Sequence, residues 1–123
     1  MLTPKRQLGN CGEAIAAAWF RTRGYQIMAT NYRAGRNELD LICRTDDDIV
    51  FVEVKTGRSG DYGSPLHRVD RKKCRAILYA AERWLLAHPQ GDRGVRFDIM
   101  SIETDKQPPA IDHLSAAFTA DDL

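Results

Sequence analysis

The sequence predicts an α/β protein, because two long segments with helical periodicity alternate with five short segments of strand character. Its 123 residues predict one domain with a single core, covering 1–123 as a whole. The core itself is expected at about 4–118, with an acidic tail at 119–123. Apolar residues form 43% and charged residues 28% of the chain, a balance typical of sequences that fold.

The first helix is expected to begin at Thr3-Pro4 and to end at Gly24. Its apolar residues recur at three- and four-residue steps, and proline suits the first helical position because its missing N–H has no partner there anyway. Gly9 and Gly12 each weaken this helix by about 1 kcal/mol relative to alanine. We therefore expect them to mark the close approach of another backbone.

A second helix and five strands complete the expected organisation. Ser64-Pro65 would cap the second helix and His88-Pro89 would end it. A glycine-rich loop, 56–64, precedes this helix. The strands are expected at 25–32, 38–44, 49–56, 94–102 and about 111–118.

Neither a membrane segment nor a secretion signal is expected. The longest uncharged apolar run covers 14–20, far short of the roughly 18 residues that a membrane span needs. The first residues are basic, but polar side chains interrupt any signal-peptide core. Three scattered cysteines without a CxxC pair predict reduced thiols and no zinc site. We expect a cytoplasmic protein.

The net charge of +1 conceals an uneven distribution along the chain. Residues 1–36 carry a net charge of +5 and 52–75 carry +4, whereas 37–51 and 89–123 each carry −4. Two basic segments therefore flank a short acidic one, a pattern that fits a polyanionic partner and an anionic or metal-binding centre. An ordinary mixed surface would give the same blocks, and charge alone does not separate the two interpretations.

The second and third expected strands carry charged residues at alternating positions. Glu38 and Asp40 share one face of their strand, and Glu53 and Lys55 share one face of the next. A turn of two or of four residues gives the same register, in which Asp40 faces Glu53 and Glu38 faces Lys55. A slip of one residue would separate Asp40 from Glu53. The residues expected on the opposite face of the first of these strands are Leu39, Leu41 and Cys43.

Two facing carboxylates whose Cβ atoms are about 5 Å apart repel each other by roughly 3 kcal/mol at an effective dielectric of 20. A divalent cation between Asp40 and Glu53 would remove this repulsion, and Mg²⁺ prefers such oxygen ligands. Lys55 would then hold or polarise a water bound to the ion. The ion would act as a Lewis acid on a phosphate oxygen and would generate hydroxide from the bound water. The alternative is an edge hairpin whose charges limit aggregation, with Lys55 paired to Glu38 or Glu53.

An aspartate, a hairpin and a Glu-x-Lys sequence after an apolar strand resemble the PD-(D/E)xK nuclease pattern, here Asp40, Glu53 and Lys55. The chain further resembles the YraN-like family of small bacterial proteins from about Gly9 to Phe118. The matching segments are Gly12-Glu13-x-x-Ala16, Gly24-Tyr25, Asn31-Tyr32-Arg33, 38–42, 51–55, Tyr62-Gly63, Lys73, 96–98 and Ala117-Phe118.

This resemblance implies a restriction-endonuclease-like core, in which two main helices flank a mixed β-sheet, similar to archaeal Holliday-junction resolvases. It implies Asp40, Glu53 and Lys55 as the active site, with Glu13 of the first helix as a further acidic member. The metal ligands would be Asp40, Glu53 and Glu13, and the ion would be Mg²⁺ or Mn²⁺.

Three positions depart from the family pattern. Asn37 replaces a usual glycine, and because asparagine tolerates a left-handed backbone the turn is expected to survive. Gly57 replaces a frequent arginine, with Arg58 adjacent, which puts a phosphate contact in question. Ala116 replaces a usual asparagine, without a consequence that the sequence discloses.

Basic residues follow the Glu-x-Lys motif, and four of them recur along one helix face. Together with the helix N-terminus behind Ser64, they are expected to contact phosphates. A solvated helix face is the alternative for any single residue. The residues expected to bind nucleic acid are Arg58, Arg68, Arg71, Lys72, Lys73 and Arg75.

Two functions are therefore expected. The first is a metal-dependent endonuclease that hydrolyses phosphodiester bonds in DNA, with branched or otherwise structured DNA as the candidate substrate. The second is a nucleic-acid-binding module of nuclease fold with weak or no catalysis. The intact Asp40, Glu53 and Lys55 favour the enzyme, because a binding module does not need mutually repelling acids. The small size and limited basic surface favour the module, or a homodimer with twice the contact area.

Overall fold

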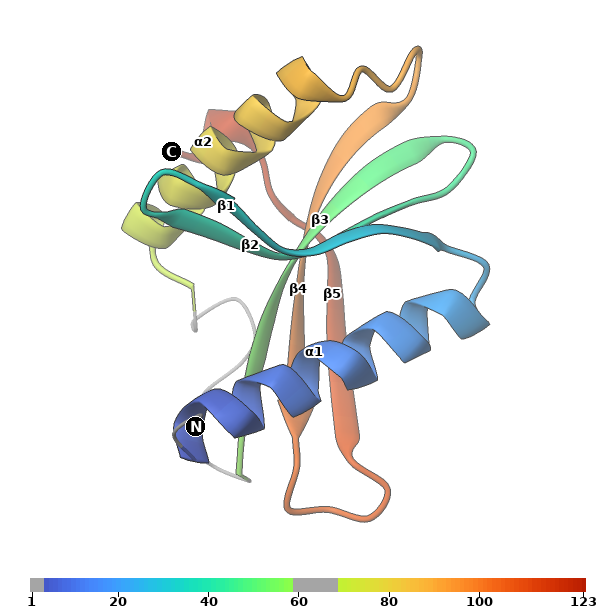
Figure 1. Cartoon of the computed structure of the whole chain (residues 1–123), viewed down its shortest axis with the longest axis vertical. Coiled ribbons are helices and arrows are strands. Elements are labelled where there is room, and N and C mark those ends of the chain that lie inside the picture. The colour runs from blue at the N-terminus through green and yellow to red at the C-terminus, as the bar shows by residue number, and fades with distance from the viewer. Residues whose placement is uncertain (1–3, 59–68) are drawn as a thin grey trace.

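Two helices flank a twisted five-stranded sheet in the computed structural model, which describes residues 4–58 and 69–123 (Figure 1). The elements in chain order are α1 (Pro4–Thr22), β1 (Gln26–Ala34), β2 (Asn37–Arg44), β3 (Asp48–Gly57), α2 (Arg71–Ala87), β4 (Gly94–Glu103), β5 (Ala110–Phe118) and the short 3₁₀ helix η2 (Ala120–Asp122). The predicted α/β class is confirmed.

The sheet is mixed, with the strand order β1-β2-β3-β4-β5. β3 pairs with β4 in parallel, and the other neighbouring pairs are antiparallel. A parallel pair needs a crossover connection, and α2 lies within it. The arrangement is consistent with a restriction-endonuclease-like core.

Each helix covers one face of the sheet with its own apolar core. On the α1 face, the buried residues are Ala16, Ala17, Phe20, Leu41, Cys43, Val50, Val52, Met100 and Ile102. On the α2 face, they include Leu39, Ile42, Ile49, Phe51, Cys74, Ile77, Trp84, Phe97 and Ile99. Alternate residues of β3 thus enter different cores, as expected for a strand buried on both faces. Within the described ranges, no helix combines the length and hydropathy that a membrane span requires.

The first helix has the predicted bounds. Gly24, with φ of +87°, follows its last turn, and the amide of Tyr25 donates to the carbonyl of Phe20 at 3.1 Å. Gly12 marks a close approach, because a Cβ at this position would overlap Cγ2 of Thr56 on β3. The neighbour is a side chain rather than the backbone that we expected. The surroundings of Gly9 lie outside what the structure describes.

The predicted start of the second helix is wrong. α2 begins at Arg71, behind Asp70, whose carboxylate accepts the amide of Lys73 at 2.8 Å. Aspartate is as good an N-cap as serine, and the prediction did not consider Asp70 for this position. Ser64-Pro65 lies outside the described residues. The predicted end is confirmed, since His88 is the C-cap and its amide donates to Trp84 at 2.8 Å.

A buried carboxylate joins β4 and β5 on the α1 face. The side chain of Asp98 is fully buried and accepts two hydrogen bonds from the guanidinium of Arg96, at 2.9 and 3.0 Å. Nε2 of His113 lies 2.7 Å from Asp98, and the amide of Ala116 donates to it at 3.0 Å. Burial alone would raise the pKa of Asp98, but these hydrogen bonds hold it below its ordinary value.

Candidate metal and phosphate site between β2 and β3

The candidate site lies in a fork where β2 separates from β3. Their ladder runs from Arg44 opposite Ile49 to Leu41 opposite Val52, in the register that the sequence predicts. It stops there, whereas β3 continues beside β4 as far as Gly57. The two strands therefore diverge immediately before Asp40.

The carboxylate of Asp40 takes the place of the missing ladder bond, since its Oδ2 accepts the amide of Val54 at 2.8 Å. Beyond this point β2 no longer follows the alternation predicted for it. Leu39 packs into the core beneath α2, whereas Leu41 and Cys43 pack against α1. The predicted common face for these three residues is therefore wrong, because β2 leaves β3 between Leu39 and Leu41. The ladder ends before Glu38, so Glu38 and Lys55 are not the backbone pair that the register predicted.

Asp40 and Glu53 lie close together, as predicted, because Asp40 accepts the amide of Val54, the residue after Glu53, although the ladder ends one pair before them. Glu53 is only 5% exposed, and burial followed by the charge of Asp40 raises its pKa from 4.5 to about 8. Burial also raises the pKa of Asp40, against the opposing effect of its hydrogen bond from Val54. The pair is thus disfavoured as two carboxylates in the absence of a nearby cation.

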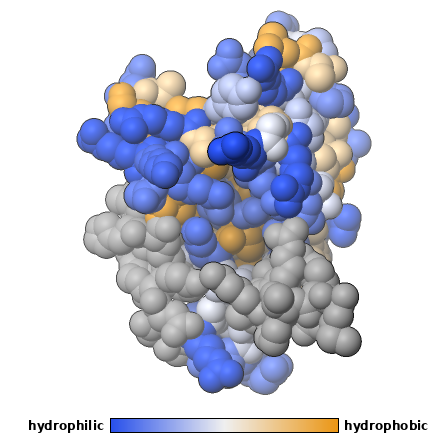
Figure 2. Space-filling view, turned by 60° about the vertical axis from the view of Figure 1, so that its left-hand side comes forward, coloured by the Kyte–Doolittle hydropathy of each residue, from blue (hydrophilic) through white to orange (hydrophobic). Residues whose placement is uncertain are grey.

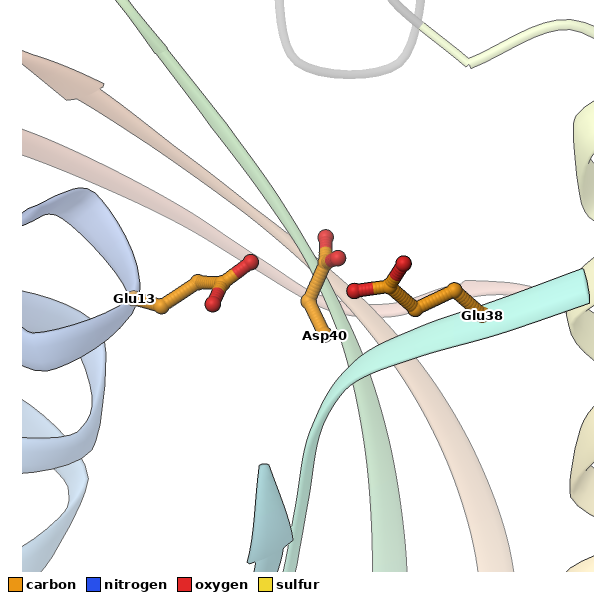
Figure 3. A group of neighbouring side chains, drawn as sticks. All are labelled: Glu13, Glu38 and Asp40. Carbon is orange, nitrogen blue, oxygen red and sulfur yellow. The ribbon is translucent and has the colours of Figure 1, made fainter. Parts of the chain in front are cut away.

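Glu13 and Glu38 bring two more carboxylates to Asp40, as Figure 3 shows. One oxygen from each of these three residues lies within 4.8 Å of the other two. Glu13 comes from α1, and the close contact of Gly12 with Thr56 brings this part of α1 up to β3. Glu38 comes from β2 and also lies 3.4 Å from Nη2 of Arg33.

Glu38 is the acidic residue that the sequence did not single out as a ligand. Alternation along the strand had placed Glu38 beside Asp40, and this signal was sufficient to find it. Glu53 is not part of the three-carboxylate group, but it adjoins that group through Asp40.

Two lysines face the two oxygens of Glu53. Nζ of Lys55 lies 3.8 Å from Oε1, and Nζ of Lys73 lies 3.8 Å from Oε2. Lys55 belongs to β3, as predicted. Lys73 belongs to the first turn of α2 and was predicted only as a phosphate contact.

Four of the other basic residues predicted to bind nucleic acid lie within the described part of the chain. Arg71, Lys72 and Arg75 are exposed on α2, and Arg58 is exposed at the end of β3. Arg68 lies outside the described residues. The predicted helix N-terminus behind Ser64 is not the end of α2, whose capped first turn lies at Asp70. Figure 2 shows the side that lies to the left in Figure 1, where hydrophilic residues cover most of the upper surface.

The three departures from the family pattern have clear positions in the fold. The turn before β2 is preserved, but its left-handed residue is Gly35, with φ of +63°, rather than Asn37. Gly57 ends β3 opposite Glu103, directly before Arg58. Ala116 has φ of +52°, in the left-handed region where asparagine is better tolerated than alanine.

The fold and the site together define a class of protein: an α/β domain with a restriction-endonuclease-like arrangement and a carboxylate cluster beside two lysines. A family model described as "Uncharacterised protein family UPF0102" matches residues 12–102. The chain belongs to this UPF0102, or YraN-like, family, which confirms the resemblance seen in its motifs.

Similar UPF0102 proteins occur in several bacteria. The chain is 39% identical to one from Anaeromyxobacter dehalogenans over 117 residues, which cover 95% of this chain and 87% of that protein. It is 41% identical to one from Syntrophomonas wolfei, with 92% and 98% covered. It is also 41% identical to one from Geobacter metallireducens, with 92% and 93% covered.

Proposed function

We propose that this protein is a metal-dependent endonuclease that hydrolyses phosphodiester bonds in DNA. The observation that carries the proposal is the convergence of four carboxylates from α1, β2 and β3 beside the ammonium groups of Lys55 and Lys73. The proposal places the chain in the PD-(D/E)xK nuclease superfamily, with Asp40, Glu53 and Lys55 as its motif residues.

The donor set fits a hard divalent cation. Glu13, Glu38, Asp40 and Glu53 gather four carboxyl groups at one place, and a divalent ion would offset the repulsion among them. Oε2 of Glu53 is buried and has no hydrogen-bond partner among the described residues. Carboxylate oxygens are the ligands that Mg²⁺ and Mn²⁺ prefer. Asp40, Glu53 and Glu13 would hold the ion, with Glu38 as a further candidate.

When bound, such an ion supplies a Lewis acid for a phosphate oxygen and lowers the pKa of a coordinated water. Lys55 would hold and orient the attacking water through its ammonium group. The water oxygen forms a bond to phosphorus while one phosphodiester P–O bond breaks, and the water proton passes to the departing oxygen. The products are a phosphate monoester and a hydroxyl group.

The proposed partner is DNA, approached through the exposed cations around the fork. Arg71, Lys72 and Arg75 are exposed on the helix that carries Lys73, and Arg58 directly follows β3. Such side chains bind phosphates without reading sequence, so the affinity is expected to fall as salt rises. Branched DNA stays the candidate substrate, and a homodimer would double the contact surface.

A nucleic-acid-binding module with weak or no catalysis is the second candidate. Two observations favour it: Asp40 already accepts the Val54 amide, and Glu53 already faces two lysines. These contacts reduce the need of both acids for a cation.

An assay with three DNA structures separates the two candidates. Duplex, single-stranded and four-way-junction DNA are incubated with the purified protein in Mg²⁺, in Mn²⁺ and in EDTA. We expect metal-dependent cleavage that is lost in Asp40→Asn and in Lys55→Ala. Binding without cleavage in every condition would favour the module.

The assay has matched controls on exposed residues of the same charge. Asp112→Asn removes an exposed carboxylate from β5. Lys106→Ala removes an exposed amine that pairs with Glu103 at 2.9 Å. Both are expected to cleave like the unmodified protein, and loss of activity in both would contradict the proposed site.

A further inference from the structure

Lys73 is held in a defined place at the start of α2. Its backbone amide donates to the N-cap carboxylate of Asp70 at 2.8 Å, which fixes the first turn of the helix. From there its ammonium group reaches Oε2 of Glu53 at 3.8 Å. The contact connects α2 directly with the buried acid of β3.

The contact is too long for a hydrogen bond, and Lys55 makes an equally long one to the other oxygen of Glu53. The two amines differ in origin and in exposure. Lys55 lies two residues beyond Glu53 on the same strand and is 29% exposed, whereas Lys73 is 38% exposed. Lys73 also adjoins the exposed Lys72, so it lies between the basic surface of α2 and the acids.

We propose that Lys73 is a catalytic residue of the proposed hydrolysis, whose ammonium group binds a non-bridging oxygen of the phosphate that is cleaved. This inference rests on the proposed function. A cation held by Asp40 and Glu53 would engage the oxygen that Lys73 now faces. The ammonium group would then exchange its carboxylate partner for the incoming phosphate, while Lys55 acts on the water.

A purely structural ion pair is the competing explanation for the same contact. Such a pair would attach α2 to the sheet, and its loss would change stability without changing the response to DNA or metal. At 3.8 Å and with a partly exposed lysine, its contribution to stability is expected to be small.

The first experiment measures single-turnover cleavage at saturating DNA over a series of Mn²⁺ concentrations. We expect Lys73→Met to lower the rate constant by about 100-fold, the usual effect of losing a donor to a developing phosphate charge. We expect Lys73→Arg to recover most of this loss, because it keeps the charge. Lys106→Met removes an exposed lysine that pairs with Glu103 and that is not among the residues proposed to bind DNA, so it is expected to leave the rate constant intact.

Two results of this experiment would overturn the inference. One is a rate constant for Lys73→Met equal to that of the unmodified protein. The other is a full recovery of the Lys73→Met rate on raising Mn²⁺, which would show that Lys73 only positions Glu53 for the metal.

A second experiment, which does not need cleavage, measures DNA affinity in Ca²⁺ and in EDTA. We expect the divalent ion to increase the affinity of the unmodified protein and of Lys106→Met, and the increase to disappear in Lys73→Met. An equal increase in Lys73→Met contradicts the role of Lys73. If the unmodified protein binds with this increase but never cleaves, the hydrolase proposal fails while the phosphate contact stands. If it shows neither cleavage nor the increase, both proposals fail.

Discussion

Oδ2 of Asp40 accepts the backbone amide of Val54 at 2.8 Å, at the point where β2 separates from β3. The side chain of Asp40 therefore has two roles: it accepts a backbone hydrogen bond from β3, and it supplies a carboxylate to the group formed with Glu13 and Glu38. These roles can be separated by substitution.

Asp40→Ala is expected to destabilise the protein by about 1–3 kcal/mol, because the amide of Val54 loses its acceptor. Asp40→Asn keeps an acceptor oxygen and removes the repulsion with Glu53, so its stability is expected to equal or exceed that of the unmodified protein. Both variants should lose cleavage. Urea unfolding measures the stabilities, and equal destabilisation by Asn and Ala would contradict the role of the hydrogen bond.

The stability of the metal-free protein should fall as the pH rises toward about 8. Burial and the charge of Asp40 raise the pKa of Glu53 from 4.5 to about 8, so the folded protein binds a proton more tightly than the unfolded chain. The stability linked to this proton is complete below pH 4.5 and is lost as the pH passes through the folded value. Thermal unfolding in EDTA across this range measures the loss.

Divalent cations should oppose this trend. Mn²⁺ is expected to raise the melting temperature more at about pH 8 than at about pH 5, because protons and metal compete for the same oxygens. Glu53→Gln should flatten the pH dependence and reduce the effect of Mn²⁺. An equal rise at both values would be inconsistent with metal binding at Glu53.

Ala116 should be replaceable with a gain in stability. Its φ of +52° is costly for alanine, less so for asparagine and least for glycine. Ala116→Gly and Ala116→Asn are each expected to stabilise the protein by up to about 1 kcal/mol in urea unfolding. Ala116→Val, with a β-branched side chain, serves as the opposite control and should destabilise it. A glycine variant less stable than the alanine protein would argue against the strain.

Gly12 should not tolerate a methyl group unless Thr56 makes room for it. Gly12→Ala is expected to destabilise the protein by about 1–3 kcal/mol, because the added Cβ overlaps Cγ2 of Thr56. Thr56→Ser removes that methyl group and keeps the hydroxyl, so the double variant should regain most of the loss. If the two substitutions change the free energy of unfolding additively, the contact between positions 12 and 56 is not the cause of the destabilisation.

Asp98 should make the fold sensitive to acid. Its hydrogen bonds hold the folded pKa below 3.8, so its contribution to stability is present above that pH and is lost as the pH falls through the folded value. Asp98→Asn is expected to cost about 3 kcal/mol at neutral pH, since it leaves Arg96 without its buried charge partner. The difference should shrink in acid, whereas exposed Asp92→Asn should leave the pH profile unchanged.

The predictable part of the site was the part set by short-range geometry. Turn length predicted the register of the β2–β3 ladder, which ends beside Asp40 and Glu53, and the motif indicated Lys55. Lys73 could not be assigned to Glu53 from spacing, because its position depends on how a helix packs across the sheet. The N-cap of α2 was likewise missed, because the prediction placed the cap at Ser64-Pro65 and did not consider Asp70, which has an equally good capping side chain.

The break in β2 escaped prediction for a related reason. Alternation assumes that a strand keeps its neighbour, and β2 loses β3 beyond Leu41. Leu39 therefore turned to the core beneath α2, away from Leu41 and Cys43. The alternation of residues in the sequence indicates which residues share a face of a strand, but it does not indicate where the neighbouring strand stops pairing.

The parallel pairing of β3 with β4 has a consequence for how this family could diversify. A chain that leaves one strand and enters its parallel neighbour must return along the sheet, so the crossover helix starts near the carboxyl end of the strand it follows. Position 73 is therefore presented to position 53 by the topology itself. Exchange of a single helical side chain could then retune the chemistry while the acids and their strands stay as they are.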